Sequence, residues 1–317
     1  MAEFATETQR TNKPIDTHHN IKLFTFNAIL FFIFGSRTQD VQILQANFDN
    51  FVIWMAGLGD IFIPEFMNGP FAKAMVARTK LTSILLAIIK ERQSDGLNKI
   101  LFGNHEGIFL SDNELVDNLL VMIFVGHDTS TGSISSSIHY WANEMAPEEK
   151  EMLLREIEDV DGTNMTELLA LPVLDAFMKE VLRMAAPATA ILRKLNQDAD
   201  ILGHVVPSGS VLMLPYGALS YNPDVFPEPN KFNIARFLDL SAQDAKKQAY
   251  AYSPFGLGAR QCLGMHLARL ELKIFMFQLL KSFVVLKSDI PSVIEGFPVM
   301  MVKPQVKVLS VLEKHYA

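Results

Sequence analysis

Apolar residues recur at three- and four-residue spacings along most of the chain, which is the spacing of an α-helix with one face in a core. In the first half of the chain this pattern predicts helices over residues 21–34, 41–55, 70–93 and 111–143. Glycines and Pro64 predict a loop over residues 57–69, and residues 93–107 read as a solvated connection. The first half is therefore predicted to be a set of helices.

The helix predicted over residues 111–143 has a clear start signal. Ser111 and Glu114 have the form of a capping box, in which the serine accepts from the first turn and the glutamate reaches back. Residues 115–125 are apolar nearly all the way round, so we expect protein to enclose this part of the helix. At 1.5 Å per residue the helix would be roughly 45 to 50 Å long.

Prolines punctuate the second half of the chain. Pro147 and Pro172 open two further helices, the second ending near Met184. After Pro187 short apolar segments between turn residues predict strands. These strands cover residues 190–194, 199–202, 210–214, 283–286, 298–302 and 306–311. An irregular, proline-containing meander separates the third of these strands from a last long helix over residues 265–280.

Taken together, these elements predict one mainly α domain with a small β-sheet over residues 20–317, preceded by a flexible polar tail over residues 1–19. The hydrophobic content of 49% is ample for a core, and the net charge of −7 gives no support for nucleic-acid binding. A single cysteine excludes an internal disulfide framework. No stretch reaches the ~20 consecutive apolar residues that a membrane span needs.

That single cysteine, Cys262, lies in a loop with unusual surroundings. Gly256, Gly258 and Gly264 allow tight turns and close approach of a flat ligand, and Arg260 adds a fixed positive charge. The helix that follows would favour the thiolate at its positive end. An inert buried thiol is the ordinary alternative, but a thiolate in a glycine-lined loop beside an arginine suits a heme iron.

A second polar interruption stands inside the helix over residues 111–143. There the apolar run gives way to Gly126, His127, Asp128 and Thr129. One interpretation is a small polar face whose hydroxyls bond back to carbonyls one turn earlier. The other is a locally opened helix, where Gly126 admits a flat ligand and oxygen while Asp128 and Thr129 position water and protons.

At these residues the sequence resembles the cytochrome P-450 family. The family's ligand loop reads Phe-x-x-Gly-x-Arg-x-Cys-x-Gly, and the chain matches its fixed positions with Phe255, Gly258, Arg260, Cys262 and Gly264, while Gly256 also stands at its usual place after the phenylalanine. The family's oxygen-activation motif, Ala/Gly-Gly-x-Asp/Glu-Thr, is similar to the residues from Val125 to Thr129, with valine in place of the smaller first residue. The resemblance covers most of the chain from about Ile21.

The resemblance implies a structural network as well as a ligand loop. Glu180 and Arg183, three residues apart, match the family's Glu-x-x-Arg motif, in which a second arginine, here Arg236, completes a buried network. By spacing alone, Glu180 and Arg183 could equally be a surface pair worth ~0.2–0.5 kcal/mol. Arg193 stands where the family places a partner for a heme propionate; an exposed strand arginine is the alternative.

By the same resemblance, the expected fold is the heme-thiolate fold lacking its N-terminal part, and the expected cofactor is heme with Cys262 as axial ligand. One atom of O2 would enter a C–H bond of a small hydrophobic substrate and the other would leave as water, with protons arriving through Thr129 and Asp128. The expected electron donor is an NADPH-dependent flavoprotein reductase that docks near the Cys262 face and uses Lys246 and Lys247. We expect a monomer.

Residues 69–78 are similar to the group of the family that acts on sterols, triterpenoids and isoprenoid hormones. Family members carry a membrane anchor, an early sheet and a propionate-binding helix before the region where this chain begins, so the chain is expected to be N-terminally truncated. A location at the cytosolic face of the endoplasmic reticulum membrane would follow if the full-length protein carries an anchor.

Two alternatives to the monooxygenase remain open. The first is a heme-thiolate isomerase or lyase that rearranges peroxides without oxygen or a reductase, although such members tend to lose the pair matched by Asp128 and Thr129. The second is a non-catalytic fragment. Other kinds of site fail: Gln261 stands where a dinucleotide loop needs a third glycine, and the histidines show no metal spacing.

Overall fold

The structure, a computed structural model, describes residues 15–35, 38–57, 69–95, 110–238, 240–287, 292–295, 301–303 and 305–310. Its residues divide into two compact units, one formed by Lys22–Asp128 and the other by the described residues before and after that segment. In the part of the chain that the structure describes, no helix is both long and apolar enough to span a membrane.

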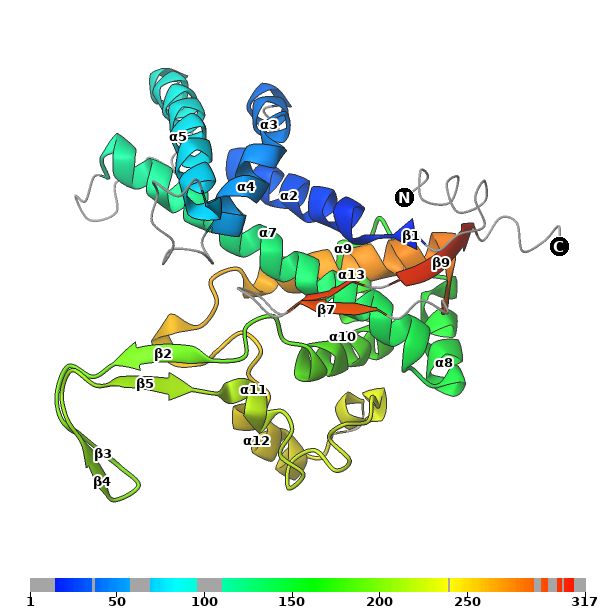
Figure 1. The fold of residues 1–317 in the computed structure, drawn as a ribbon. Helices are drawn as coiled ribbons and strands as arrows, with labels where there is room; N and C mark the ends of the chain where they lie inside the picture. The colour runs from blue at the N-terminus through cyan, green and yellow to red at the C-terminus, as the bar shows by residue number, and fades with distance from the viewer. Residues whose placement is uncertain are drawn as a thin grey trace. The chain divides into compact units, whose positions relative to one another are not determined.

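In its described residues, the Lys22–Asp128 unit consists of helices joined by turns, without strands (Figure 1). It contains most of α2 (His18–Phe34), α3 (Thr38–Gln45), α4 (Phe48–Gly57), α5 (Pro70–Asp95) and the first part of α7 (Asp112–Asn143). Helices α4 and α5 pack closely, because a Cβ atom at Gly57 would lie only 2.2 Å from the Ala74 Cβ. A buried ion pair, Arg92 Nη2 to Asp40 Oδ2 at 2.6 Å, ties α5 to α3.

The single helix predicted over residues 41–55 is wrong, because the chain breaks between α3 and α4. At the break, the Asn47 side chain donates a 2.9 Å hydrogen bond to the Ile43 carbonyl oxygen. Asparagine competes in this way for the backbone groups that a continuous helix would use. The Asn50 side chain then donates to Asn47 Oδ1 at 3.1 Å across the start of the new helix.

The other unit combines helices with short strands (Figure 1). Besides the last part of α7, its helices are α8 (Pro147–Glu158), α9 (Met165–Ala170), α10 (Pro172–Met184), α11 (Tyr216–Leu219), α12 (Ala242–Ala251) and α13 (Met265–Ser282), with 3-10 turns η2 (Ile234–Phe237) and η3 (Gly258–Arg260). Proline occupies the first turn of both α8 and α10, as predicted. The sequence analysis did not predict α9, α11 and α12.

The predicted class, mainly α with a small amount of β structure, is confirmed, and the strands form several separate small sheets. Their bounds are β1 (Ile15–Asp16), β2 (Ile191–Lys194), β3 (Ala199–Ile201), β4 (His204–Val206), β5 (Val211–Leu214), β6 (Phe283–Lys287), β7 (Val293–Glu295), β8 (Met301–Lys303) and β9 (Gln305–Ser310). The antiparallel pairs are β2 with β5, β3 with β4 and β7 with β8, while β9 pairs with both β1 and β6. Figure 1 shows the β3–β4 hairpin at the end of the β2–β5 ribbon.

Strand β1 and the start of α2 lie inside the residues for which a flexible tail was predicted. Ile15 pairs with Val306 of β9, and α2 begins at His18. Residues 1–14 lie outside the described residues.

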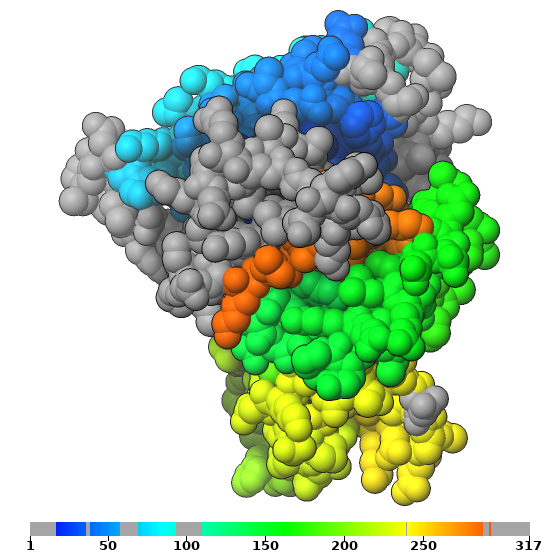
Figure 2. Space-filling view, turned by 90° about the vertical axis from the view of Figure 1, so that its right-hand side faces the viewer, coloured from blue at the N-terminus to red at the C-terminus, as the bar shows by residue number. Residues whose placement is uncertain are grey.

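Helix α13 is the central element of the second unit's core. It packs against α8, α9 and α10, and Figure 2 shows its orange surface lying along their green one. The buried Lys273 anchors it: Nζ lies 2.8 Å from Asp175 Oδ1 on α10 and donates a 2.8 Å hydrogen bond to the Leu169 carbonyl oxygen on α9. The segment that precedes α13 is therefore attached to a firmly held helix.

Helix α7 confirms the capping box and the predicted length of the long helix, since it runs over 32 residues from Asp112. Glu114 Oε2 accepts from the Ser111 backbone N–H at 2.7 Å, and Ser111 Oγ accepts from the Glu114 N–H at 3.3 Å. The prediction that protein encloses residues 115–125 is wrong, because Val121 and Val125 are 54% and 49% exposed. Their face of the helix points away from the packed side that buries Leu119 and Ile123.

Candidate active site

The loop that carries Cys262 is shaped by its own main chain. It lies between α12 and α13, and the Cys262 N–H donates a 2.9 Å hydrogen bond to the Phe255 carbonyl oxygen across the loop. Gly256 and Gly258 have φ angles of 71° and 74°, a left-handed conformation that glycine adopts without steric cost. Gly264 is the N-cap of α13, so Cys262 stands just ahead of the helix, as the sequence predicted.

This loop is compatible with a heme on three counts. Cys262 is exposed, which leaves its thiol accessible, whereas an inert core cysteine would be buried. A Cβ atom built on Gly256 or Gly258 meets nothing within 4 Å, so the glycines border open space. Arg260 is exposed in the same loop and can pair with a carboxylate.

Arg193 is brought into the same electrostatic neighbourhood through a residue that the sequence analysis missed. Burial raises the pKa of Tyr216, the Arg193 guanidinium lowers it and Cys262 raises it. Arg193 and Cys262 thus both act on the Tyr216 hydroxyl, although they lie on different elements. Arg193 is half-buried on β2 and donates a 2.9 Å hydrogen bond to the Leu192 carbonyl oxygen.

Phe255, the first residue of the loop motif, is held by a second residue that the analysis missed. The Arg269 guanidinium lies 5.4 Å from the centre of the Phe255 ring, in cation–π geometry. Arg269 follows four residues after Met265, in the second turn of α13. The sequence shows an arginine at this position of the helix, but only the fold shows that it covers the Phe255 ring.

Glu180 is the centre of the predicted structural network, and it is fully buried. Its carboxylate accepts a pair of hydrogen bonds from Arg183, at 2.7 Å from Nε and 2.9 Å from Nη2. Arg236 Nε lies 3.4 Å from Glu180 Oε1, an ion pair without hydrogen-bond geometry. The structure therefore brings Glu180, Arg183 and Arg236 together in the interior, and the surface-pair alternative fails.

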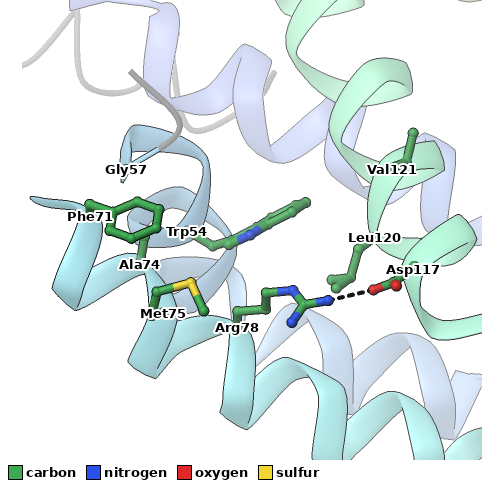
Figure 3. Close-up of a pocket in the computed structure, with 9 residues that line it drawn as sticks. All are labelled: Trp54, Gly57, Phe71, Ala74, Met75, Arg78, Asp117, Leu120 and Val121. Carbon is green, nitrogen blue, oxygen red and sulfur yellow. Dashed lines mark hydrogen bonds and ion pairs between the residues drawn. The ribbon is translucent and has the colours of Figure 1, made fainter. Parts of the chain in front are cut away.

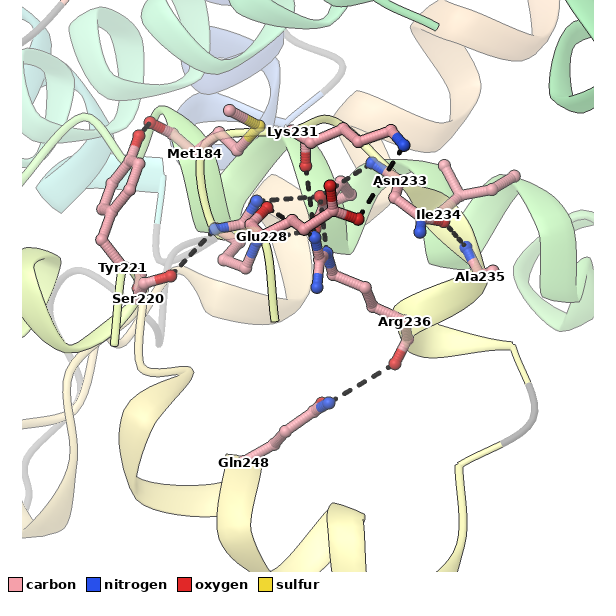
Figure 4. Close-up of polar contacts among 12 residues, drawn as sticks. Met184, Ser220, Tyr221, Glu228, Lys231, Asn233, Ile234, Ala235, Arg236 and Gln248 are labelled. Atoms are coloured by element: carbon pink, nitrogen blue, oxygen red, sulfur yellow. Dashed lines mark hydrogen bonds and ion pairs between the residues drawn. The ribbon is translucent and has the colours of Figure 1, made fainter. Parts of the chain in front are cut away.

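The network continues toward the loop (Figure 4). Arg183 Nη1 donates to the Ser220 carbonyl oxygen at 2.8 Å, and Gln248 on α12 donates from Nε2 to the Arg236 carbonyl oxygen at 3.4 Å. The Ser220 hydroxyl donates to the carbonyl oxygen of Ala251, the last residue of α12, at 3.4 Å. Contacts thus run from Glu180 to the helix end from which the Cys262 loop departs.

Gly126 and Asp128 lie in the Lys22–Asp128 unit, where the structure gives each a local environment. A Cβ atom at Gly126 would approach Ile29 Cδ1 to 2.7 Å, so the glycine lets α2 and α7 pack closely. Asp128 is buried, and burial raises the pKa of its carboxyl while the Lys22 ammonium lowers it. His127 is fully buried, with Nδ1 2.9 Å from the Thr25 hydroxyl, in a site without metal-ligand neighbours among the described residues.

From Thr129 onward, the α7 residues of the other unit form a buried stripe of small hydroxyl side chains. Its members are at most 5% exposed: Ser130, Thr131, Ser133, Ser135, Ser136 and Ser137. The Ser133 and Ser137 hydroxyls donate to carbonyl oxygens four residues earlier, those of Thr129 and Ser133, at 3.0 and 2.8 Å. The back-bonded polar face considered in the sequence analysis is therefore present, and Ser130 instead reaches Glu271 of α13.

A cavity of about 300 Å³ lies within the Lys22–Asp128 unit (Figure 3). Most of its lining is apolar and comes from α4, α5 and α7: Trp54, Gly57, Phe71, Ala74, Met75, Leu120 and Val121. Arg78 and Asp117 complete the lining, and their side chains meet at 2.5 Å. Part of the segment 69–78 noted in the sequence thus borders the cavity.

Comparison with known proteins identifies the family. A sequence model of the family described as Cytochrome P450 matches residues 1–310. A putative cytochrome P450 120 from Synechocystis sp. is 32% identical over 277 residues, 83% of this chain and 60% of that protein. The β-amyrin 11-oxidase of Glycyrrhiza uralensis is 28% identical over 291 residues, 85% of this chain and 57% of that protein.

A solved structure shows the same fold. The retinoic acid-bound cyanobacterial CYP120A1 has a TM-score of 0.83 and 27% sequence identity, over 94% of this chain and 70% of that one. The chain thus spans about 60% of the length of the curated relatives it matches. The family and its solved structures imply a heme ligated by a cysteine thiolate, and Cys262 is this chain's only cysteine. The chain belongs to the cytochrome P450 family.

Proposed function

We propose that this protein is a heme-thiolate monooxygenase that inserts one atom of O2 into a C–H bond of a small hydrophobic substrate. The observation that carries the proposal is the exposed Cys262 thiol, placed ahead of α13 by the closed main chain of its loop. Membership of the cytochrome P450 family supports it. When bound, the heme would supply the O2 activation that no side chain provides.

The residues around the loop have separate tasks in this proposal. Cys262 would hold the heme iron through its sulfur, and α13 begins at Met265, directly after the loop that carries it. Arg260 and Arg193 would bind the carboxylates of the heme, Gly256 and Gly258 would leave room for its face, and the Glu180 network would hold the loop through α12. The exposure of Arg260 and the two contacts of α12 support these assignments.

The α7 residues have the role of supplying protons in this proposal. In the proposal, Asp128 and Thr129 would hold and pass on the protons that the reaction consumes, whereas Gly126 serves the close packing of α2 against α7. The buried carboxyl of Asp128 supports this role, because its raised pKa lets it hold a proton at higher pH than an exposed aspartate.

The substrate, in the proposal, is an isoprenoid-derived compound such as a sterol or triterpenoid. The mostly apolar lining of the cavity between α4, α5 and α7 supports a hydrophobic ligand. The cavity volume of about 300 Å³ lies at the lower end of the range for small-molecule pockets. The name of the β-amyrin 11-oxidase and the retinoic acid bound to the cyanobacterial structure point to the same chemical class.

The expected location at the endoplasmic reticulum is part of this proposal.

The test is the absorbance spectrum of the purified chain, reconstituted with heme, reduced and treated with carbon monoxide. The parent chain should show the spectrum of a thiolate-ligated heme, and Cys262→Ser should lose it while keeping the same far-ultraviolet circular dichroism. Ser253→Ala, a change outside the motif but in the same segment, serves as the matched control. A parent chain that holds no heme would favour the non-catalytic fragment.

The heme-thiolate isomerase is separated from the monooxygenase by its co-substrates. Turnover of a hydroperoxide without NADPH or O2 would support the isomerase. Oxidation that requires both would support the monooxygenase, which the retained Asp128 and Thr129 favour.

A further inference from the structure

The cavity in the Lys22–Asp128 unit has one polar position in an otherwise apolar wall. Trp54 is 8% exposed and is fixed edge-on to Phe124, with ring centres 6.2 Å apart. At Gly57, where a side chain would clash with Ala74, α4 and α5 close against each other. In Figure 3 the Arg78 side chain reaches from α5 toward Asp117 on α7, beside Leu120. A ligand in this cavity would thus meet apolar surface except at the Arg78–Asp117 pair.

Arg78 and Asp117 can each form hydrogen bonds with a ligand in addition to their contact with each other. Arg78 Nη2 donates to Asp117 Oδ1 at 2.5 Å, and the two side chains remain 40% and 59% exposed. A guanidinium carries five N–H donors and a carboxylate has two oxygens, so the single contact uses only part of each. The pair therefore offers both a donor and an acceptor at the border of the cavity.

The charge of the pair determines which polar group suits it. The two charges sum to zero, so a neutral hydroxyl can accept from Arg78 and donate to Asp117 at once. A ligand carboxylate would also accept from Arg78, but it would face the negative charge of Asp117. A hydrocarbon would leave the pair without any new hydrogen bond.

We infer that this cavity takes a mainly apolar ligand carrying one hydroxyl, and that Arg78 and Asp117 are the residues that select the hydroxyl. The inference rests on the proposed function in treating the cavity as the substrate site. Binding can nevertheless be measured without turnover, so the two can fail separately.

Tryptophan fluorescence of the full chain provides the measurement, because one of the chain's two tryptophans, Trp54, lines the cavity. The background variant is Trp141→Phe, which leaves Trp54 as the only reporter. Three probes share one carbon skeleton: farnesol with a hydroxyl, farnesene with no polar group and farnesoic acid with a carboxylate. Equilibrium dialysis of the same probes against the unsubstituted chain supplies a second measurement if Trp141→Phe fails to fold.

Farnesol should bind saturably and about tenfold or more tightly than farnesene or farnesoic acid, because a hydrogen bond to a charged group discriminates on that scale. Arg78→Leu, which removes the donor, should reduce the preference for farnesol over farnesene, and Arg78→Leu combined with Asp117→Leu should abolish it. Asp117→Asn should strengthen farnesoic acid binding, because the opposing charge is gone. Lys80→Gln, a charge change at an exposed position of the same helix outside the cavity lining, should leave all three affinities unchanged.

Equal affinity for the three probes, tightest binding of farnesoic acid to the parent, or no saturable binding of farnesol would each overturn the inference. A farnesol preference in a chain that shows no thiolate-ligated heme spectrum would uphold it and refute the proposed function. The opposite result, a heme spectrum without probe selection, would refute the inference alone.

Discussion

The Ser130 hydroxyl on α7 donates a 2.8 Å hydrogen bond to Glu271 Oε2 on α13, joining residues 141 positions apart in the sequence. Both side chains are buried, at 3% and 6% exposure. The other oxygen, Oε1, has no hydrogen-bond partner among the residues that the structure describes. Burial raises the pKa of the Glu271 carboxyl to about 7, although the Ser130 hydrogen bond lowers it.

This raised pKa predicts how stability depends on pH. The folded chain holds the Glu271 proton up to about pH 7, whereas the unfolded chain releases it near the ordinary value of 4.5. The stabilising effect is therefore complete below pH 4.5 and is lost as pH rises through about 7, a loss of roughly 3 kcal/mol in the free energy of unfolding. Urea unfolding between pH 4.5 and 8 measures it. Glu271→Gln should flatten this dependence, and Glu158→Gln, at an exposed position of α8, should not; equal slopes in all three proteins would contradict the assignment.

Removing Glu180 should be among the most destabilising single changes in this unit. Glu180→Ala leaves the buried Arg183 guanidinium without its carboxylate, at a cost of about 3–5 kcal/mol in the free energy of unfolding. The matched control is Glu151→Ala, because Glu151 pairs with Arg155 at the exposed surface of α8, where a pair contributes about 0–1 kcal/mol. Urea midpoints of the two variants should differ clearly; a loss in Glu180→Ala no larger than in the control would show that the network does not stabilise the fold.

Asp128→Asn tests the proposed proton delivery. The amide keeps the shape of the side chain but carries no acidic proton, so oxidation of a substrate should fall roughly 100-fold or more. In the parent the rate should decline as pH rises through the raised pKa of Asp128, because the carboxyl must hold its proton, and this decline should vanish in the variant. Asp159→Asn, an exposed position, is the control. The proposal would not survive an unchanged rate in Asp128→Asn together with an unchanged pH profile.

The expectation that a flavoprotein reductase docks on α12 can be tested by charge reversal. Lys246 and Lys247 are exposed on α12, in the same unit as the Cys262 loop. Changing both to glutamate should slow reduction of the heme by the flavoprotein reductase at low salt, and the difference should shrink as salt screens it. Lys287→Glu, at an exposed position at the end of β6, should have no such effect. Stopped-flow reduction rates that match between parent and double variant would place the docking surface elsewhere.

Local signals in the sequence explain which elements were predicted well. Pro172 sets the start of α10, and the observed end at Met184 agrees with the prediction. The break at Asn47 was missed because periodicity continues through it and only a side-chain hydrogen bond reveals the turn. Helix α12 was missed because its residues are mostly polar. The cap that starts it, Ser241 Oγ accepting from the Asp244 N–H at 3.1 Å, does not by itself predict a helix.

The candidate site shows the same division between local and distant information. Glycines, arginine and cysteine within ten residues identified the Cys262 loop, and the spacing of Glu180 and Arg183 identified their pair. The contacts of Arg269 with Phe255 and of Ser130 with Glu271 depend on how helices pack, which no spacing encodes. The same holds for Tyr216, whose connection to Arg193 and Cys262 joins three separate elements.

The Cys262 N–H to Phe255 carbonyl bond carries a consequence for how this region can diverge. Because the main chain and the glycines set the turn, the exposed side chains at Leu257, Ala259, Gln261 and Leu263 contribute little to its shape. These alternating positions should tolerate replacement by almost any residue while the sulfur keeps its place. Substitutions among relatives would then concentrate at these alternating positions. The charge and shape of the surface around the thiol could change while the position of the Cys262 sulfur stays the same.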